Sequence, residues 1–213
     1  MSQFQTETFT FPLSGGPVPL FPIPNLFLIP GALLPLNVVG SRFRPMVEEL
    51  LDSNGLLVLG TALDVDIVSE EDGVEPHEVE PIGGLGYLET YEVIDEDRYL
   101  ILPRGLARVT IEELSGDHPY RQTMYRVLEE APVPEESREA LDRDLRDAIA
   151  HRAGPELELP NGLALGQLAD LLLMHLQLEP NTMNEVYGIA EAEARAERVL
   201  AEYRTIRDTL DQA

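Results

Sequence analysis

The sequence has 213 residues, of which 44% are apolar and 25% are charged, a mixture that predicts a folded chain of one large or two small domains. It contains no cysteine and, read along its length, no lysine, which excludes disulfides, Cys-bound metals, Schiff-base lysines, Walker A phosphate sites and Ser-Lys dyads. A formal net charge of -24 argues against partners with phosphate backbones or anionic lipid surfaces.

The N-terminal residues 1–16 are polar with scattered phenylalanines, and we expect a tail or a loosely attached segment. They show neither the basic start nor the apolar run of a secretory signal, and no later window is apolar enough to cross a membrane. A cytoplasmic location is therefore expected.

The segment from Val18 to Leu36 is strongly apolar but has a proline every few residues. Proline excludes a helix here and restricts strands to short pieces with edge or bulge character. After it, Ser41 is placed to cap a helix with Pro45 in its first turn, and Asn54-Gly55 is placed to end it. The apolar positions of this helix have helical spacing: Phe43, Met46, Val47, Leu50 and Leu51.

Several short strands are expected next. The run Leu56 to Leu63 indicates a buried strand, and the acidic stretch Asp64 to Glu80 indicates a solvated loop. Alternating residues from Tyr87 to Val93 and from Tyr99 to Leu102 predict a hairpin, and two further strands are expected at 106–114 and 120–128. Such a series favours a small barrel or sandwich.

Beyond Pro134 the composition becomes helical. Three stretches have helical spacing, and they are separated by Gly154-Pro155 and by Glu179-Pro180-Asn181: residues 135–152, 163–178 and 190–210. The sequence thus predicts an α+β chain, with a strand-rich unit at 17–130 and a helical bundle at 131–213.

Three blocks in the same order resemble the LON substrate-binding domain family. The first is PLFPIPNLFLIPGAL followed by LPLNVVGSRFRPMVEELL, the second is PIGGLGYLETYEVIDEDRYLILPRGLARVTIEEL followed by HPY, and the third is LADLLLMHLQLEPN with ERVLAEYRTI after it. The resemblance covers roughly residues 17 to 210. It implies a PUA-like β pseudo-barrel followed by an α-helical bundle, and a role in recognising and holding protein substrates.

The sequence departs from the family pattern in two respects. Family members often carry His and Glu where Asn37 and Gly40 stand here. The ATPase and peptidase domains that follow this domain in Lon protease are missing from the sequence, so the resemblance implies no catalysis.

The Pro-rich segment is the first candidate for a partner-binding surface, because apolar side chains on an extended edge can hold unfolded polypeptide. Alternatively, Phe21, Leu26, Leu28 and Leu34 are core residues of the barrel. The candidates that we select from this segment are Phe21, Pro24, Phe27 and Pro30.

Four arginines, together with Phe43, supply the second group of candidates. Arg42 and Arg44 flank Phe43 at the start of a helix, and Arg104 and Arg108 flank Gly105, for which we expect a turn with positive φ. Their forked donors suit carboxylates of a bound peptide, but pairing with the abundant Glu and Asp of this chain is the alternative.

No cofactor or metal site is expected. The four histidines stand far apart, and the start of a calcium loop at Asp64 fails because Ser69 stands where the loop needs glycine. The run Gly83-Gly84-Leu85-Gly86 contains the G-x-G start of a G-x-G-x-x-G dinucleotide motif, but the last glycine of that motif and the helix that follows it are missing.

We therefore expect a binding module that is not an enzyme and whose partner is protein or unfolded polypeptide. We expect no nucleic-acid partner and no membrane partner, and a homo-oligomer is possible. Two alternatives stay open. One is RNA binding, as in other PUA-like proteins, which needs a basic patch that the sequence does not show. The other is a hydrolase with an unrecognised serine or carboxylate site.

Overall fold

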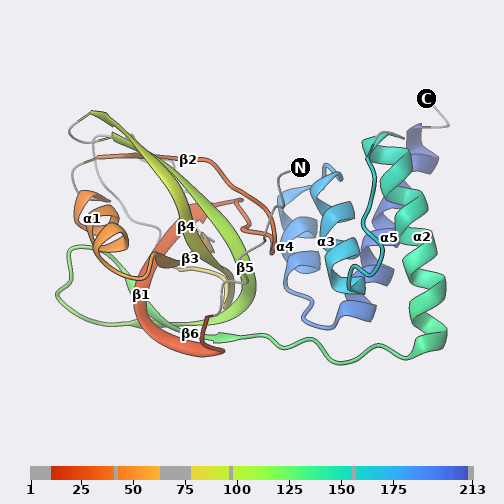
Figure 1. The fold of residues 1–213 in the computed structure, drawn as a ribbon, viewed down its shortest axis with the longest axis horizontal. Coiled ribbons are helices and arrows are strands. Elements are labelled where there is room, and N and C mark those ends of the chain that lie inside the picture. The colour runs from red at the N-terminus through yellow and green to blue at the C-terminus, as the bar shows by residue number, and fades with distance from the viewer. Residues whose placement is uncertain (1–10, 41–42, 63–77, 96–97, 155–156, 211–213) are drawn as a thin grey trace, which may run out of the picture.

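Strands fill the N-terminal part of the molecule and helices its C-terminal part (Figure 1). The computed structural model describes residues 11–40, 43–62, 78–95, 98–154 and 157–210. The elements follow one another as β1 (Ser14–Pro24), β2 (Leu36–Val39), α1 (Arg44–Asp52), β3 (Leu56–Ala62), β4 (Ile82–Asp95), β5 (Arg98–Leu114), β6 (Gln122–Val127), α2 (Glu135–Ala153), α3 (Leu165–Met174), α4 (Pro180–Tyr187) and α5 (Ala192–Leu210). The expected α+β class is confirmed.

The strands form a six-stranded sheet in the order β2-β5-β4-β3-β1-β6. An additional β5–β6 pairing closes five of these strands into a ring, and β2 extends the ring from the outer part of β5. Neighbours are antiparallel except for β1 and β3, which run parallel. One hydrophobic core lies inside this ring of strands. A second hydrophobic core lies at the end of the ring that α1 covers.

The Pro-rich segment forms a longer and more central strand than the sequence predicts. β1 already begins at Ser14, inside the stretch expected as a tail, and it lies between β6 and β3. Its first half pairs mainly with β6 and its second half with β3, with a bulge between Gly15 and Val18. Because each half has one main partner, a proline lacking its N–H can face the side without a ladder.

β5 is one continuous strand where the sequence suggested two. Gly105 lies inside it without a positive φ, so the expected turn at this position is wrong. Glycine is needed there for close approach instead: an added Cβ would lie 2.2 Å from the carbonyl oxygen of Ile29. The segment after β1 therefore packs directly on the β5 backbone, with Gly31 N donating to Gly105 O at 2.9 Å and Gly105 N to Ala32 O at 2.8 Å.

The helices agree with the predicted spacing except at α4. Pro180, expected to break a helix, instead starts α4 within its first turn, where the missing N–H has no intrahelical partner to lose. Within the bundle, α4 lies nearest the sheet and α2 farthest from it (Figure 1). The bundle core includes Ile29 from the segment after β1, so sheet and bundle share a packed boundary.

No helix in the described part of the chain is long and apolar enough to span a membrane.

Candidate functional site

One wall of the candidate site is the C-terminal half of α1. The buried residues Met46, Val47 and Leu50 hold this helix against the end of the sheet, while Leu51 on the next position is 38% exposed. The chain leaves the helix through Gly55, whose φ of +70° suits glycine, and Gly55 O accepts a hydrogen bond from Leu88 N at 2.9 Å. The bend thus fixes α1 beside β4.

The other wall is the outer half of β4. Tyr91 pairs with Ile101 and Val93 with Tyr99, so both lie on the face of the hairpin that carries these buried β5 residues. Ile101 and Tyr99 belong to the core under α1, but Tyr91 is 47% and Val93 is 57% exposed. The apolar face of the hairpin therefore extends beyond the part that α1 covers.

A groove of about 540 Å³ separates these walls. Its described lining comes from three stretches of chain, residues 11–12, 87–91, and 50–56 without Asp52, with Leu50, Leu51, Leu88 and Tyr91 among the apolar residues. A larger hollow of about 670 Å³ has all of its described lining within residues 113–122, the loop between β5 and β6 and the adjoining strand ends. The groove is the stronger candidate because it joins separate elements and is mostly apolar.

Glu89 is the charged residue among the described lining of the groove, and it is paired. Glu89 accepts hydrogen bonds from Arg104 Nε at 2.9 Å and Nη2 at 3.2 Å, and this donor lowers the pKa of Glu89 below its ordinary value. In the core under α1, burial and the nearby Glu49 carboxylate raise the pKa of Tyr120 to about 12. Neither pair offers a free acid or base aimed into the groove.

The structure places the Pro-rich candidates mostly in packed positions. Phe21 is buried and meets Phe43 edge-on at 5.2 Å between ring centroids, a packed position of the kind that the core alternative expects. Phe27 is half-buried against Tyr187, Pro30 is half-buried beside Gly105, and Pro24 is exposed at the end of β1. The structure does not gather these residues into one surface, and their part in binding stays a prediction.

The arginine candidates also separate. Arg44 is exposed and donates to Glu48 at 2.8 Å, and Arg104 pairs with Glu89, as the acid-rich alternative expects. Arg42 lies outside the described residues. Arg108 is only 4% exposed, so a partner could reach it only after the surrounding structure opened.

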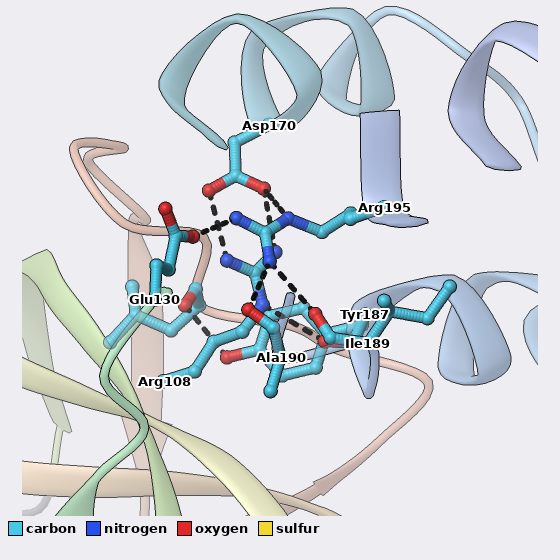
Figure 2. A network of polar contacts seen from close by, with 8 residues as sticks. Arg108, Glu130, Asp170, Tyr187, Ile189, Ala190 and Arg195 are labelled. Carbon is cyan, nitrogen blue, oxygen red and sulfur yellow. Dashed lines mark hydrogen bonds and ion pairs between the residues drawn. The ribbon is translucent and has the colours of Figure 1, made fainter. Parts of the chain in front are cut away.

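Arg108 belongs to a buried polar network between sheet and bundle (Figure 2). Its two terminal nitrogens donate to both oxygens of Asp170 in α3, at 2.7 and 2.9 Å, and its Nε donates to Tyr187 O at 2.9 Å. Arg195 of α5 donates from Nε to the same carboxylate at 3.0 Å and from Nη2 to Glu130. Burial alone would lower the pKa of Arg108, but the hydrogen bonds and the charge of Asp170 outweigh it and raise this pKa, so the guanidinium keeps its charge.

Sequence reasoning missed the partners of Arg108 and the exposed groove residues. A signal existed for the network: Asp170 stands in the apolar run LADLLLM and Arg195 on the buried face of α5, and such lone charges require a partner. No comparable signal existed for Leu51 and Tyr91, because their exposure depends on where α1 ends relative to β4.

The described residues offer no group of three or more His, Asp or Glu side chains that could hold a metal ion. His118 meets Tyr120 edge-on at 4.9 Å, and His151 Nδ1 lies 3.0 Å from the hydroxyl of Tyr203. The geometry of the groove supports holding an apolar partner.

Comparison with known proteins identifies relatives of this chain. A family model described as the ATP-dependent protease La (LON) substrate-binding domain matches residues 17–202. The chain is 25% identical to the Lon protease of Roseiflexus castenholzii over 203 residues and 27% identical to Lon protease 2 of Sorangium cellulosum over 199 residues. These matches cover 91% and 86% of this chain but 24% of each protease, so the chain spans about a quarter of their length.

Solved structures show the same fold. The N-terminal domain of a Mycobacterium avium complex Lon protease superposes with a TM-score of 0.67 at 15% identity, covering 88% of this chain and 97% of that domain. The Lon N-terminal domain protein from Xanthomonas campestris gives a TM-score of 0.58 at 17% identity, covering 86% and 96%. Because the family model matches residues 17–202 and the fold is shared with Lon N-terminal domains, the chain belongs to the LON substrate-binding domain family.

Proposed function

We propose that this chain is a non-catalytic module that binds unfolded polypeptide in the groove between α1 and β4. The observation that carries the proposal is the apolar hairpin face, which continues from the core under α1 to the exposed side chains of Tyr91 and Val93. Exposed apolar surface that is continuous with a groove marks sites of protein contact. The family match to a substrate-binding domain supports the same function.

The finer features of the proposal follow the family. We infer that the closed sheet is a PUA-like pseudo-barrel, that the chain works in the cytoplasm, and that it contributes no peptidase or ATPase activity of its own. Pro24, Phe27, Pro30 and Arg44 remain proposed contacts for a partner that extends beyond the groove.

The test compares two double variants. Leu51→Ser with Tyr91→Ser removes apolar area from the groove, and Leu114→Ser with Met174→Ser removes similarly exposed apolar area elsewhere: Leu114 is 38% exposed, like Leu51, and Met174 is 49% exposed, close to Tyr91. The probe is a fluorescent, permanently unfolded protein whose cysteines are blocked with iodoacetamide, and the readout is fluorescence anisotropy. We expect the groove variant to lose about 1 kcal/mol or more, a roughly fivefold weaker Kd, and the control to bind as before.

Two results contradict the proposal. One is equal affinity of the unfolded probe for both variants, or no binding of the probe to the parent chain or to either variant. The other is the appearance of new peptides by mass spectrometry, or of ADP, when the pure chain is incubated with unfolded protein and ATP.

A further inference from the structure

The groove adjoins an open strand edge. Thr90–Asp95 pairs with β5 on one side, whereas β3 stops pairing with β4 at Tyr87 and the last bond on that side joins Leu88 N to Gly55 O. Within the ranges that the structure describes, no strand occupies the other side of Thr90–Asp95. Among the described residues, alternate N–H and C=O groups of Thr90–Val93 therefore have no ladder partner on that side, and they could pair with a further strand.

The edge has few of the features that usually protect such strands. Its sequence, TYEVID, contains neither proline nor a basic residue, and Tyr91, Val93 and Ile94 are all exposed. Bulges occur between Leu88 and Thr90 and between Val93 and Asp95, which leaves Thr90–Val93 in regular pairing with β5. An added strand would thus have a regular template of about two residue pairs on each face.

The surroundings of the edge are acidic. Asp52, Glu89, Glu92 and Asp95 contribute four carboxylates, against two guanidinium groups, Arg104 on Glu89 and Arg98 on Asp95. Asp52 and Glu92 make no ion pair with any residue that the structure describes. Asp52 also ends α1, whose last turn has no basic residue to offset the partial negative charge of its carbonyl groups.

We propose that the open edge of β4 takes an extended, positively charged peptide segment as an additional strand. Apolar side chains at alternate positions of the segment contact Leu51, Tyr91 and Val93, and Arg or Lys side chains at its ends lie beside Asp52 and Glu92. The inference rests on the proposed function and adds to it a backbone ladder and a preference for cationic segments. A second copy of this chain suits the edge less well, because it would bring a second excess of carboxylates to the same place.

Labelled peptides test both parts. The reference peptide has seven residues, with arginine at both ends and valine, phenylalanine and leucine alternating with serine or threonine. A second peptide has glutamate at both ends, and a third keeps the arginines but carries N-methyl groups on two backbone amides of one edge. By anisotropy at low salt, we expect the glutamate and N-methyl peptides each to bind at least about tenfold more weakly, and added salt to weaken the reference peptide.

Matched charge variants locate the effect. Asp52→Asn with Glu92→Gln is expected to weaken the reference peptide about fivefold. Glu139→Gln with Glu158→Gln makes the same change in net charge on the bundle, at exposed residues without a described ion pair, and should leave binding within about twofold.

Equal Kd values for the arginine and glutamate peptides, undiminished binding of the N-methyl peptide, or equal effects of the two charge variants would overturn the inference. If the unfolded-protein probe still distinguishes the groove variant in that case, the proposed function stands without it. A dimer in analytical ultracentrifugation that Tyr91→Ser abolishes would assign the edge to a second copy and also overturn the inference.

Discussion

Asp170 shows how much a single buried carboxylate can control in this chain. It lies between the guanidinium groups of Arg108 and Arg195, both buried, and accepts three hydrogen bonds from them. Removing one partner from such a set leaves an uncompensated charge away from water, which costs more than the pair contributes. The two arginines would then also repel each other.

Asp170→Asn should therefore lower the free energy of unfolding by about 3–5 kcal/mol, measured by urea denaturation. Asp144→Asn is the matched control, because Asp144 pairs with Arg204 on the surface at 3.2 Å and should matter by less than about 1 kcal/mol. Equal stability of the two variants would show that the buried network contributes little.

Single residues were also where sequence reasoning was least reliable. Arg108 and Arg104 look alike in PRGLAR, yet Arg108 points into the boundary with the bundle and Arg104 to the surface. The residue that separates them is Asp170, which stands 62 positions further along the chain than Arg108. The local sequence pattern around an arginine cannot predict a contact with a residue so far away along the chain.

At the scale of elements, β5 depends on the absence of a side chain at Gly105. The carbonyl of Ile29 and the backbone of Pro30 occupy the space where a Cβ would lie. Because these atoms are backbone, they cannot move aside as the end of a flexible side chain can.

Gly105→Ala should destabilise the fold by roughly 1–3 kcal/mol through overpacking, seen as a lower thermal midpoint. Gly116→Ala is the control, since an added Cβ at Gly116 meets nothing within 4 Å. If Gly105→Ala unfolds at the same temperature as the control, the close approach of the two segments is not a constraint.

Elements with a strong local pattern were predicted well. The buried strand at β3 and the helices α2, α3 and α5 lie within a few residues of their expected bounds, and β4 and β5 pair as the expected hairpin although both strands are longer than predicted. The Pro-rich strand and α4 differ from the prediction. A proline lacks one backbone N–H, and whether this disrupts a strand or helix depends on whether a partner would have accepted a hydrogen bond from that N–H. The groove could not be predicted, because it depends on the relative position of α1 and β4.

At the scale of the whole molecule, the dominant quantity is the net charge of -24. Thirty-nine acidic residues face fifteen arginines, so even complete pairing leaves most carboxylates uncompensated. Repulsion among these carboxylates destabilises the compact state, and we expect it to outweigh the small stabilisation from the surface ion pairs. Salt should therefore stabilise the fold, because it screens the repulsion more than it weakens those pairs.

The thermal midpoint should accordingly rise by a few degrees as NaCl is increased to roughly 0.3 M, where the Debye length falls below about 8 Å. KCl at equal ionic strength serves as the control against specific ion binding. A midpoint that stays constant or falls would mean that the arginine pairs outweigh the general repulsion.

The buried network also limits how this domain can be recombined. Residues 108 and 130 come from the sheet side, and residues 170, 187 and 195 from the helices, yet they satisfy one another's hydrogen bonds. A chimera that grafts only the closed sheet onto a new host would carry Arg108 without its counter-ion and Leu28 O without the hydroxyl of Tyr187. Any part of this domain that is grafted onto another protein must therefore include α3, α4 and α5 together with the sheet.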